Sequence, residues 1–162
     1  YPTLRLFRQT RIGDWEGVFE RIAQTVRDQL GVSRPVFVEI APGELLDKLT
    51  ILDIKAARIT DPGKLKNVET EREILSAARA RAIPPLPDLE PLIGELRQVN
   101  EAPWDIEDEI RLCEERSDFG DRFVELARSV YQRNDRRAAL KRAINERLSS
   151  RIVEEKSFTA VP

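Results

Sequence analysis

Acidic side chains recur at helical spacing in two parts of this sequence. Glu44 and Asp47 are three residues apart, and Glu101, Asp105 and Asp108 follow one another at intervals of four and three. Both patterns place carboxylates on one face of a helix. Sites made only of carboxylates suit Mg²⁺, Ca²⁺ or Mn²⁺, so a Mg²⁺-dependent hydrolase of nucleotides or phosphate esters is one hypothesis. The metal ligands would then be Glu44, Asp47, Asp105 and Asp108. The interpretation that we favour is a solvated or arginine-paired face without metal or other cofactor.

Other polar residues could join such a site or serve only the fold. Lys48 follows Glu44 by four residues, which predicts an ion pair between them in the first turns of a helix. Asn134 interrupts an apolar stripe, and Arg137 and Lys141 lie one turn apart, from where they could face the acids around 101–109. We interpret these three residues as fixing helix alignment; a polar pocket between helices is the alternative.

Asn100 and Trp104 flank the acidic run, and Trp104 or Tyr131 could also stack on a sugar ring. If residues 152–153 pair as a strand with 36–40, Lys156 would approach the first acidic pair. We assign no catalytic residue. The candidate polar or binding site consists of Glu44, Asp47, Lys48, Asn100, Trp104, Asp105, Asp108, Asn134 and Lys156.

The composition excludes several classes of chemistry. The 162 residues include no His and one Cys, which rules out Ser-His-Asp and Cys-His catalysis within the chain and His-ligated or Cys-rich metal sites. The formal net charge is −2, which disfavours nucleic acid as a partner. No apolar run approaches the roughly 18 residues that span a bilayer, and no signal peptide is visible, so we expect a cytoplasmic protein. The chain begins with Tyr1 and contains no Met, so we expect it to be a piece of a longer protein.

The elements that must position these residues are mostly helices. Apolar stripes with alternating intervals of three and four predict helices over 14–30, 43–59, 61–82, 88–117 and 121–148. Residues 36–40 are rich in β-branched side chains and predict a strand, with 152–153 as its partner. The fold class is therefore mostly α: antiparallel helical hairpins, or a four-helix bundle, with a minor two-stranded pairing.

Two residues of the fourth predicted helix lead to more detailed predictions. Pro103 lies inside the fourth helix, where proline costs about 3 kcal/mol, and predicts a bend near 99–103. Cys113 lies on the apolar seam of the same helix and is expected to be buried.

Two stretches resemble known bacterial proteins. The segments YPTLRLFRQ (1–9) and GDW (13–15), with the helix that follows, resemble the C-terminal end of glycosyltransferase-like domains of the GT-B, heptosyltransferase type, which follow tetratricopeptide repeats. The remainder resembles a small bacterial helical family of unassigned function, found alone or fused to such glycosyltransferase or repeat proteins. The matching segments are PGELLDKLTIL (42–52), ITDP (59–62), VNEA (99–102), WDIEDEIR (104–111), NDRRA (134–138) and IVEEKSF (152–158). The family pattern has a helix former where Pro103 stands.

The resemblance implies an organisation and a role. Residues 1–34 would be the tail element of an upstream glycosyltransferase-like domain that this chain does not contain, and 36–162 would form the helical domain. About 30 residues cannot hold a GT-B domain, so this chain alone should not transfer sugars. We expect a non-catalytic binding or assembly module, with the upstream domain or a second copy as partner through its helical seams. A glycan-binding domain is a further alternative. Without its parent domain, the helix over 14–30 would expose Trp15, Phe19 and Ile22, inviting self-association.

Overall fold

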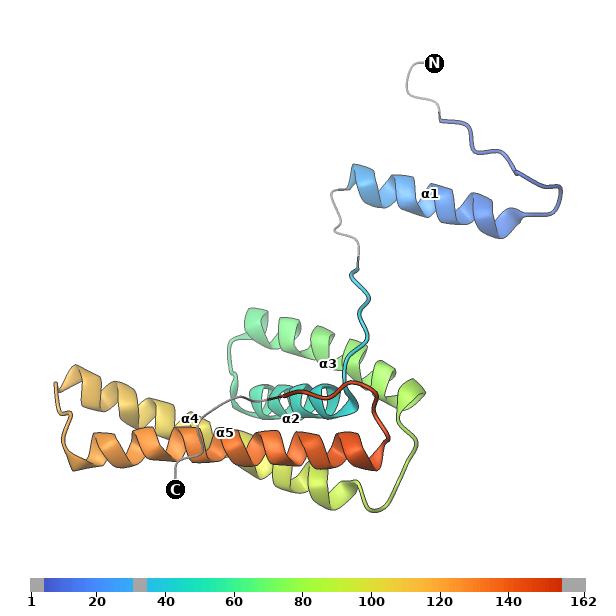
Figure 1. Ribbon diagram of the computed structural model, residues 1–162. Helices are drawn as coiled ribbons and strands as arrows, with labels where there is room; N and C mark the ends of the chain where they lie inside the picture. Colours follow the sequence, from blue (N-terminus) through green and yellow to red (C-terminus); the bar gives the residue numbers. More distant parts are fainter. Residues whose placement is uncertain (1–4, 31–34, 156–162) are drawn as a thin grey trace. The chain divides into compact units, whose positions relative to one another are not determined.

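Five α-helices make up the computed structural model, which describes residues 5–30 and 35–155. The helices are α1 (Trp15–Gln29), α2 (Pro42–Arg58), α3 (Pro62–Ala82), α4 (Glu90–Glu115) and α5 (Asp121–Arg147) (Figure 1). The described residues contain no strand. The mostly α fold class is therefore confirmed, and the helix boundaries lie within a few residues of the expected ones. The chain separates into two compact units, Tyr1–Glu39 and Ile40–Pro162.

The first unit is built around α1. The carboxylate of Asp14 accepts a hydrogen bond from the Gly17 N–H at 3.0 Å and so caps the start of the helix. Only Val18 is buried in this helix. Trp15 and Phe19, 61% and 64% exposed, form one apolar edge. A helix of this length with so little burial has no core of its own.

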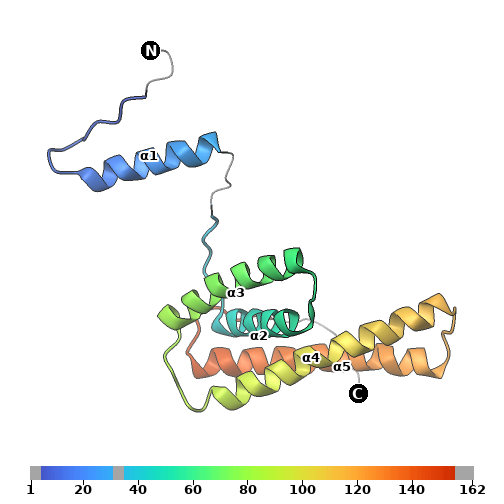
Figure 2. The ribbon, with the colours of Figure 1, turned by 180° about the vertical axis from the view of Figure 1, so that it is seen from behind.

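The second unit consists of two helical hairpins joined through α2. The short turn at 59–61 joins α2 to α3, and the turn at 116–120 joins α4 to the antiparallel α5 (Figures 1 and 2). α2 packs against α3, α4 and α5, whereas α3 packs only against α2 among these helices. This position explains why α2 carries leucines on more than one side. The innermost side chains come from three helices and the loop before α4: Leu46, Leu89, Leu96, Leu140 and Ile144.

The predicted strand over 36–40 is wrong. These residues form no regular structure, and all five are exposed. Residues 152–153 form no strand either, so the two segments are not paired. β-branched side chains favour extended backbone, but a strand also needs a neighbouring backbone to complete its hydrogen bonds, and neither segment has one in the described part of the chain.

Of the two expectations for α4, the burial of Cys113 needs correction, whereas the bend near 99–103 stays a prediction. The helix is unbroken from Glu90 to Glu115 although Pro103 lies inside it. Packing against α2 and α5 holds its backbone helical where proline removes one hydrogen bond. Cys113 is only partly buried, since α5 is the one described helix that lies beside this end of α4 (Figures 1 and 2).

Candidate functional site

A buried carboxylate lies at the centre of the three-helix contact between α2, α4 and α5. The side chain of Asp47 on α2 is 1% exposed. Its Oδ1 accepts hydrogen bonds from Asn100 Nδ2 at 2.8 Å and from Arg137 Nε at 2.7 Å, and its Oδ2 accepts from Arg137 Nη2. Asn100 Nδ2 also donates to Thr50 Oγ1 at 2.8 Å, and that hydroxyl donates to the Asp47 carbonyl at 2.7 Å. Each polar group therefore has a partner inside the fold.

One turn towards the beginning of α2, a buried lysine bridges two chain segments. Lys141 Nζ of α5 lies 2.6 Å from Glu44 Oε2 on α2 and 2.5 Å from Glu154 Oε2 in the segment after α5. Next to it, Asn145 Oδ1 accepts the Gly43 N–H at 2.7 Å. This bond caps α2 from a different helix, which is needed because Ala41 at the N-cap offers no side-chain acceptor. Together we call these residues the polar cluster: Gly43, Glu44, Asp47, Thr50, Asn100, Arg137, Lys141, Asn145 and Glu154.

The cluster favours the charged form of both its basic groups. The hydrogen bonds from Arg137 to Asp47 outweigh the burial of the guanidinium and raise the pKa of Arg137. Burial of Lys141 acts against its charge, but the hydrogen bonds to Glu154 and Glu44 outweigh it, so the pKa of Lys141 is also raised. Neither group is therefore suited to take up or release protons near neutral pH.

Gly43 is required by the close approach of α2 to α5. A Cβ at this position would lie 2.5 Å from the Lys141 carbonyl oxygen and 2.8 Å from Asn145 Oδ1. The first of these neighbours is backbone and cannot rotate away. The glycine thus allows the hydrogen bond that caps the helix.

The acids of α4 are held by a different residue. Arg58, at the end of α2, lies 3.1 Å from Asp105 Oδ1 and 3.7 Å from Glu101 Oε1, with its guanidinium 5.8 Å from the ring centroid of Trp104. Asp108 is exposed, one turn further along α4. Asp105 and Asp108 therefore lie outside the polar cluster. Within the described residues, no group of three or more acidic or Cys side chains converges on a point where a metal ion could bind.

Two expected pairings differ in the structure. Arg137 and Lys141 do not face the acids of α4. They bind Asp47 and Glu44 of α2, which packs against both α4 and α5. Lys48 does not pair with Glu44 but lies 2.6 Å from Glu71 on α3. A pair four residues apart on an exposed helix contributes only about 0.2–0.5 kcal/mol, so partners on neighbouring helices displace it easily.

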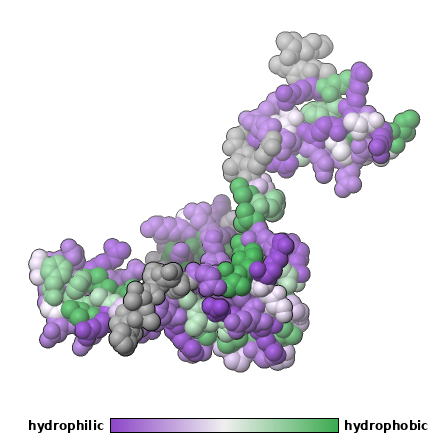
Figure 3. Space-filling view, in the orientation of Figure 1, coloured by the Kyte–Doolittle hydropathy of each residue, from purple (hydrophilic) through white to green (hydrophobic). Residues whose placement is uncertain are grey.

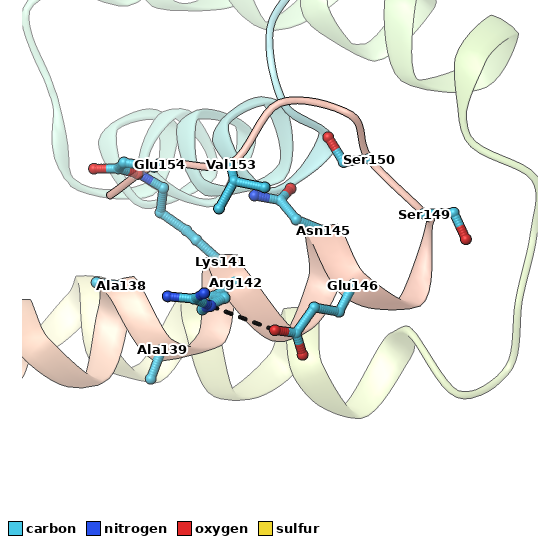
Figure 4. Close-up of a pocket in the computed structure, with 10 residues that line it drawn as sticks. All are labelled: Ala138, Ala139, Lys141, Arg142, Asn145, Glu146, Ser149, Ser150, Val153 and Glu154. Atoms are coloured by element: carbon cyan, nitrogen blue, oxygen red, sulfur yellow. Dashed lines mark hydrogen bonds and ion pairs between the residues drawn. The ribbon is translucent and has the colours of Figure 1, made fainter. Parts of the chain in front are cut away.

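Two small cavities adjoin these residues. One, of about 300 Å³, lies between α5 and the segment that follows it (Figure 4). Lys141 and Asn145 point towards Val153 and Glu154 at its edge. The other, of about 150 Å³, lies between α4 and α5, and Asn134 lines it together with Asn100 and Arg137.

The structure thus brings together three of the nine residues of the expected site. Glu44, Asp47 and Asn100 belong to the polar cluster, and Asn134 lies beside it; Lys48, Trp104, Asp105 and Asp108 do not belong to it. Lys156 falls outside the described residues, although Glu154 of the same segment does reach the cluster. The sequence analysis did not predict that Asn145 caps α2 at Gly43. Two signals could have suggested it: α2 begins with proline and glycine and has no capping side chain of its own, and Asn145 lies inside the apolar stripe of α5.

Comparison with known proteins identifies a family but no activity. Residues 36–162 match the model of a family of unknown function, DUF6165, and since this is most of the chain, the chain belongs to that family. No curated protein matches, and neither does any solved structure. None of the helices in the described ranges, 5–30 and 35–155, has the length and apolar character needed to cross a membrane.

Proposed function

We propose that this member of a family of unknown function is a non-catalytic binding and assembly module that works beside a glycosyltransferase-like domain. The observation that carries the proposal is the contrast between its polar and apolar side chains. The buried polar groups bind one another, as in the Asp47–Arg137–Asn100 network. Those that line the two small cavities, such as Lys141 and Arg137, are already paired with carboxylates. Large apolar side chains, by contrast, are exposed on α1 and on the α4–α5 hairpin.

In this proposal α1 is the docking element for the upstream domain. Its apolar edge, made by Trp15, Phe19 and Val26, is exposed, although the helix is capped at its start and amphipathic. Exposed apolar edges of this kind are typical of surfaces that bind another protein. Because residues 1–30 resemble the end of a GT-B domain, we take the partner of α1 to be a domain of that type.

Fluorescence of Trp15 tests this proposal directly. Trp15 and Trp104 are the two tryptophans of the chain, so the Trp104→Phe variant reports on α1 alone. We expect its emission to shift to the blue and to saturate when a separately produced GT-B glycosyltransferase-like domain, taken from a chain that carries both domains, is added. Phe19→Glu should weaken this binding, while Ile74→Glu, on the exposed side of α3, should not. Emission that stays unchanged would contradict the docking role.

The hydrolase alternative is checked on the same protein. Release of phosphate from nucleoside triphosphates in the presence of Mg²⁺, lost in the Asp105→Asn and Asp108→Asn variants, would overturn a non-catalytic role. We expect no release above the level of a buffer control.

A further inference from the structure

The free end of the α4–α5 hairpin extends beyond the reach of α2. The last contacts of α2 with α4 are made by Arg58, which meets Asp105 and Trp104. From there to the turn at 116–120, the hairpin consists of two helices, and neither α2 nor α3 covers it (Figures 1 and 2). Two helices alone cannot bury the apolar sides of both.

Apolar side chains are exposed on this bare part, which we call the tip surface. Figure 3 shows apolar groups gathered at the free end of the hairpin. Leu112 follows Asp105 by two helical turns and so continues the side of α4 that meets the end of α2; Val124 and Tyr131 share a side of α5. The tip surface consists of Leu112, Phe119, Val124 and Tyr131, which are 46%, 52%, 41% and 43% exposed.

The two helices of the tip carry opposite charge. Residues 106–118 hold six acids and two arginines, whereas 121–133 hold two acids and three arginines. The hairpin already pairs some of these charges internally, since Arg122 binds Glu109. Others remain available: Asp108 and Glu115 on α4 and Arg128 on α5 form no ion pair with any residue in the described part of the chain.

We propose that the tip surface binds the tip surface of a second copy of this chain, with α4 of one copy beside α5 of the other. This inference rests on the proposed function as an assembly module and names one of its partners. A two-fold rotation places the acidic α4 of each copy beside the basic α5 of the other. The same surface is therefore complementary to itself, as a two-fold symmetric interface requires. The four helices would then enclose the apolar side chains that each hairpin leaves open.

A second copy suits this surface better than a basic or acidic partner does. A uniformly basic helix would meet Arg128, and a uniformly acidic one would meet Asp108 and Glu115, so each would bring like charges together. Only a partner that itself presents one helix of each sign satisfies both sides.

Sedimentation equilibrium of the full chain tests the proposal. We expect a mass that rises with concentration from 18.6 kDa to twice that value. Leu112→Glu and Val124→Glu each place a charge in the tip surface and should hold the mass at that of the monomer. Ile74→Glu is the matched control, because Ile74 is exposed on α3, and it should leave the dimer intact. Circular dichroism should show unchanged helix content in all three variants.

A charge exchange tests the arrangement of the helices. Asp108→Arg and Arg128→Glu should each weaken the dimer, and the double variant should restore it, because the two signs are then exchanged. A monomeric wild-type chain, or a dimer that survives Leu112→Glu and Val124→Glu, would overturn the proposal. A double variant that dimerises more weakly than either single variant would also overturn the proposal. Docking of α1, measured by Trp15 emission, does not depend on any of these results, so failure of the tip interface and failure of the proposed function can be told apart.

Discussion

Asp47 and Arg137 show why residues with the composition of an active site can serve the fold. Each carboxylate oxygen of Asp47 accepts a hydrogen bond from the guanidinium, and Asn100 donates a further bond. Paired in this way inside a helix contact, the Asp47 carboxylate lines neither of the two cavities beside it. Buried ion pairs often contribute little net stability, but they specify which helices align.

Removal of the Asp47 side chain should destabilise the fold, because its hydrogen-bond partners then have no acceptor. We expect Asp47→Ala to lower the free energy of unfolding by about 3–5 kcal/mol, since Arg137 and Asn100 are left without their acceptor in a buried contact. The exposed neighbour Lys48→Ala should cost less than about 1 kcal/mol. Urea unfolding of the two variants measures both values; equal losses would show that the Asp47 network does not hold the helices together.

Lys141 gives the fold a specific response to alkaline pH. Its pKa is raised above the ordinary 10.5, so its charge contributes stability that is fully present below that pH and is lost as the pH rises through the higher folded value. The stability difference between wild type and Lys141→Gln should therefore stay constant from neutral pH to about pH 10 and shrink above it. Urea unfolding at a series of pH values checks this; a difference that grows with pH would mean that the lysine is folded in its neutral form.

Two serines occupy backbone positions that favour glycine. Ser117 and Ser149 have φ angles of 52° and 50° in the left-handed region, immediately after the last turns of α4 and α5. A side chain in this conformation costs roughly 1 kcal/mol. Ser117→Gly and Ser149→Gly should each raise the free energy of unfolding by up to about 1 kcal/mol, as thermal or urea unfolding would show. A loss of stability in both variants would mean that the hydroxyl groups do more than fill the turn.

At the scale of the helices, Gly43 fixes how closely α2 approaches α5. Gly43→Ala should destabilise the protein by about 1–3 kcal/mol, because the new methyl group meets the Lys141 carbonyl and disturbs the cap from Asn145. Gly94→Ala is the matched control: no atom lies within 4 Å of its added methyl group, and the helix propensity of alanine should stabilise α4 by about 0.5–1 kcal/mol. Unfolding free energies of opposite sign are expected for the two variants; the same sign would contradict the close approach.

The helices could be predicted from the sequence, but their neighbours could not. Spacing of three and four residues determines which side of its own helix a residue occupies, and this was enough to place Leu96 and Ile144 in the core. The spacing does not determine which helix lies opposite. Arg137 and Lys141 were therefore expected against α4, the other partner of the same hairpin, and instead meet α2.

The expected strand failed for a related physical reason. The residues 36–40 have the composition of a strand, but a strand exists only where a second backbone supplies hydrogen bonds, and this depends on the tertiary arrangement. The candidate site was only partly predictable for the same reason. Asp47 and Asn100 were singled out as polar residues at helical positions, whereas the cap from Asn145 depends on a contact between residues 102 positions apart.

At the scale of the whole molecule, the polar and apolar side chains are not distributed as in an enzyme, where reactive polar groups face a cleft and apolar groups are buried. The side chains of the polar cluster are paired with one another, and large apolar side chains are exposed on α1 and on the hairpin tip. This contrast supports the proposed role as a binding module, in which α1, part of the first compact unit, is the docking element.

The unfolding midpoint of the full chain, measured with and without Mg²⁺ and a nucleoside triphosphate, distinguishes the binding module from the hydrolase most directly. A ligand that binds only the folded state raises the midpoint in proportion to the logarithm of its concentration. We expect no shift at any concentration of Mg²⁺ or nucleotide, because the candidate acids in the described part of the chain do not converge on one point, and Glu44, Asp47 and Asp105 each pair with a basic side chain. A midpoint that climbs steadily with either, and no longer does so in Asp105→Asn, would contradict a binding module and restore the hydrolase.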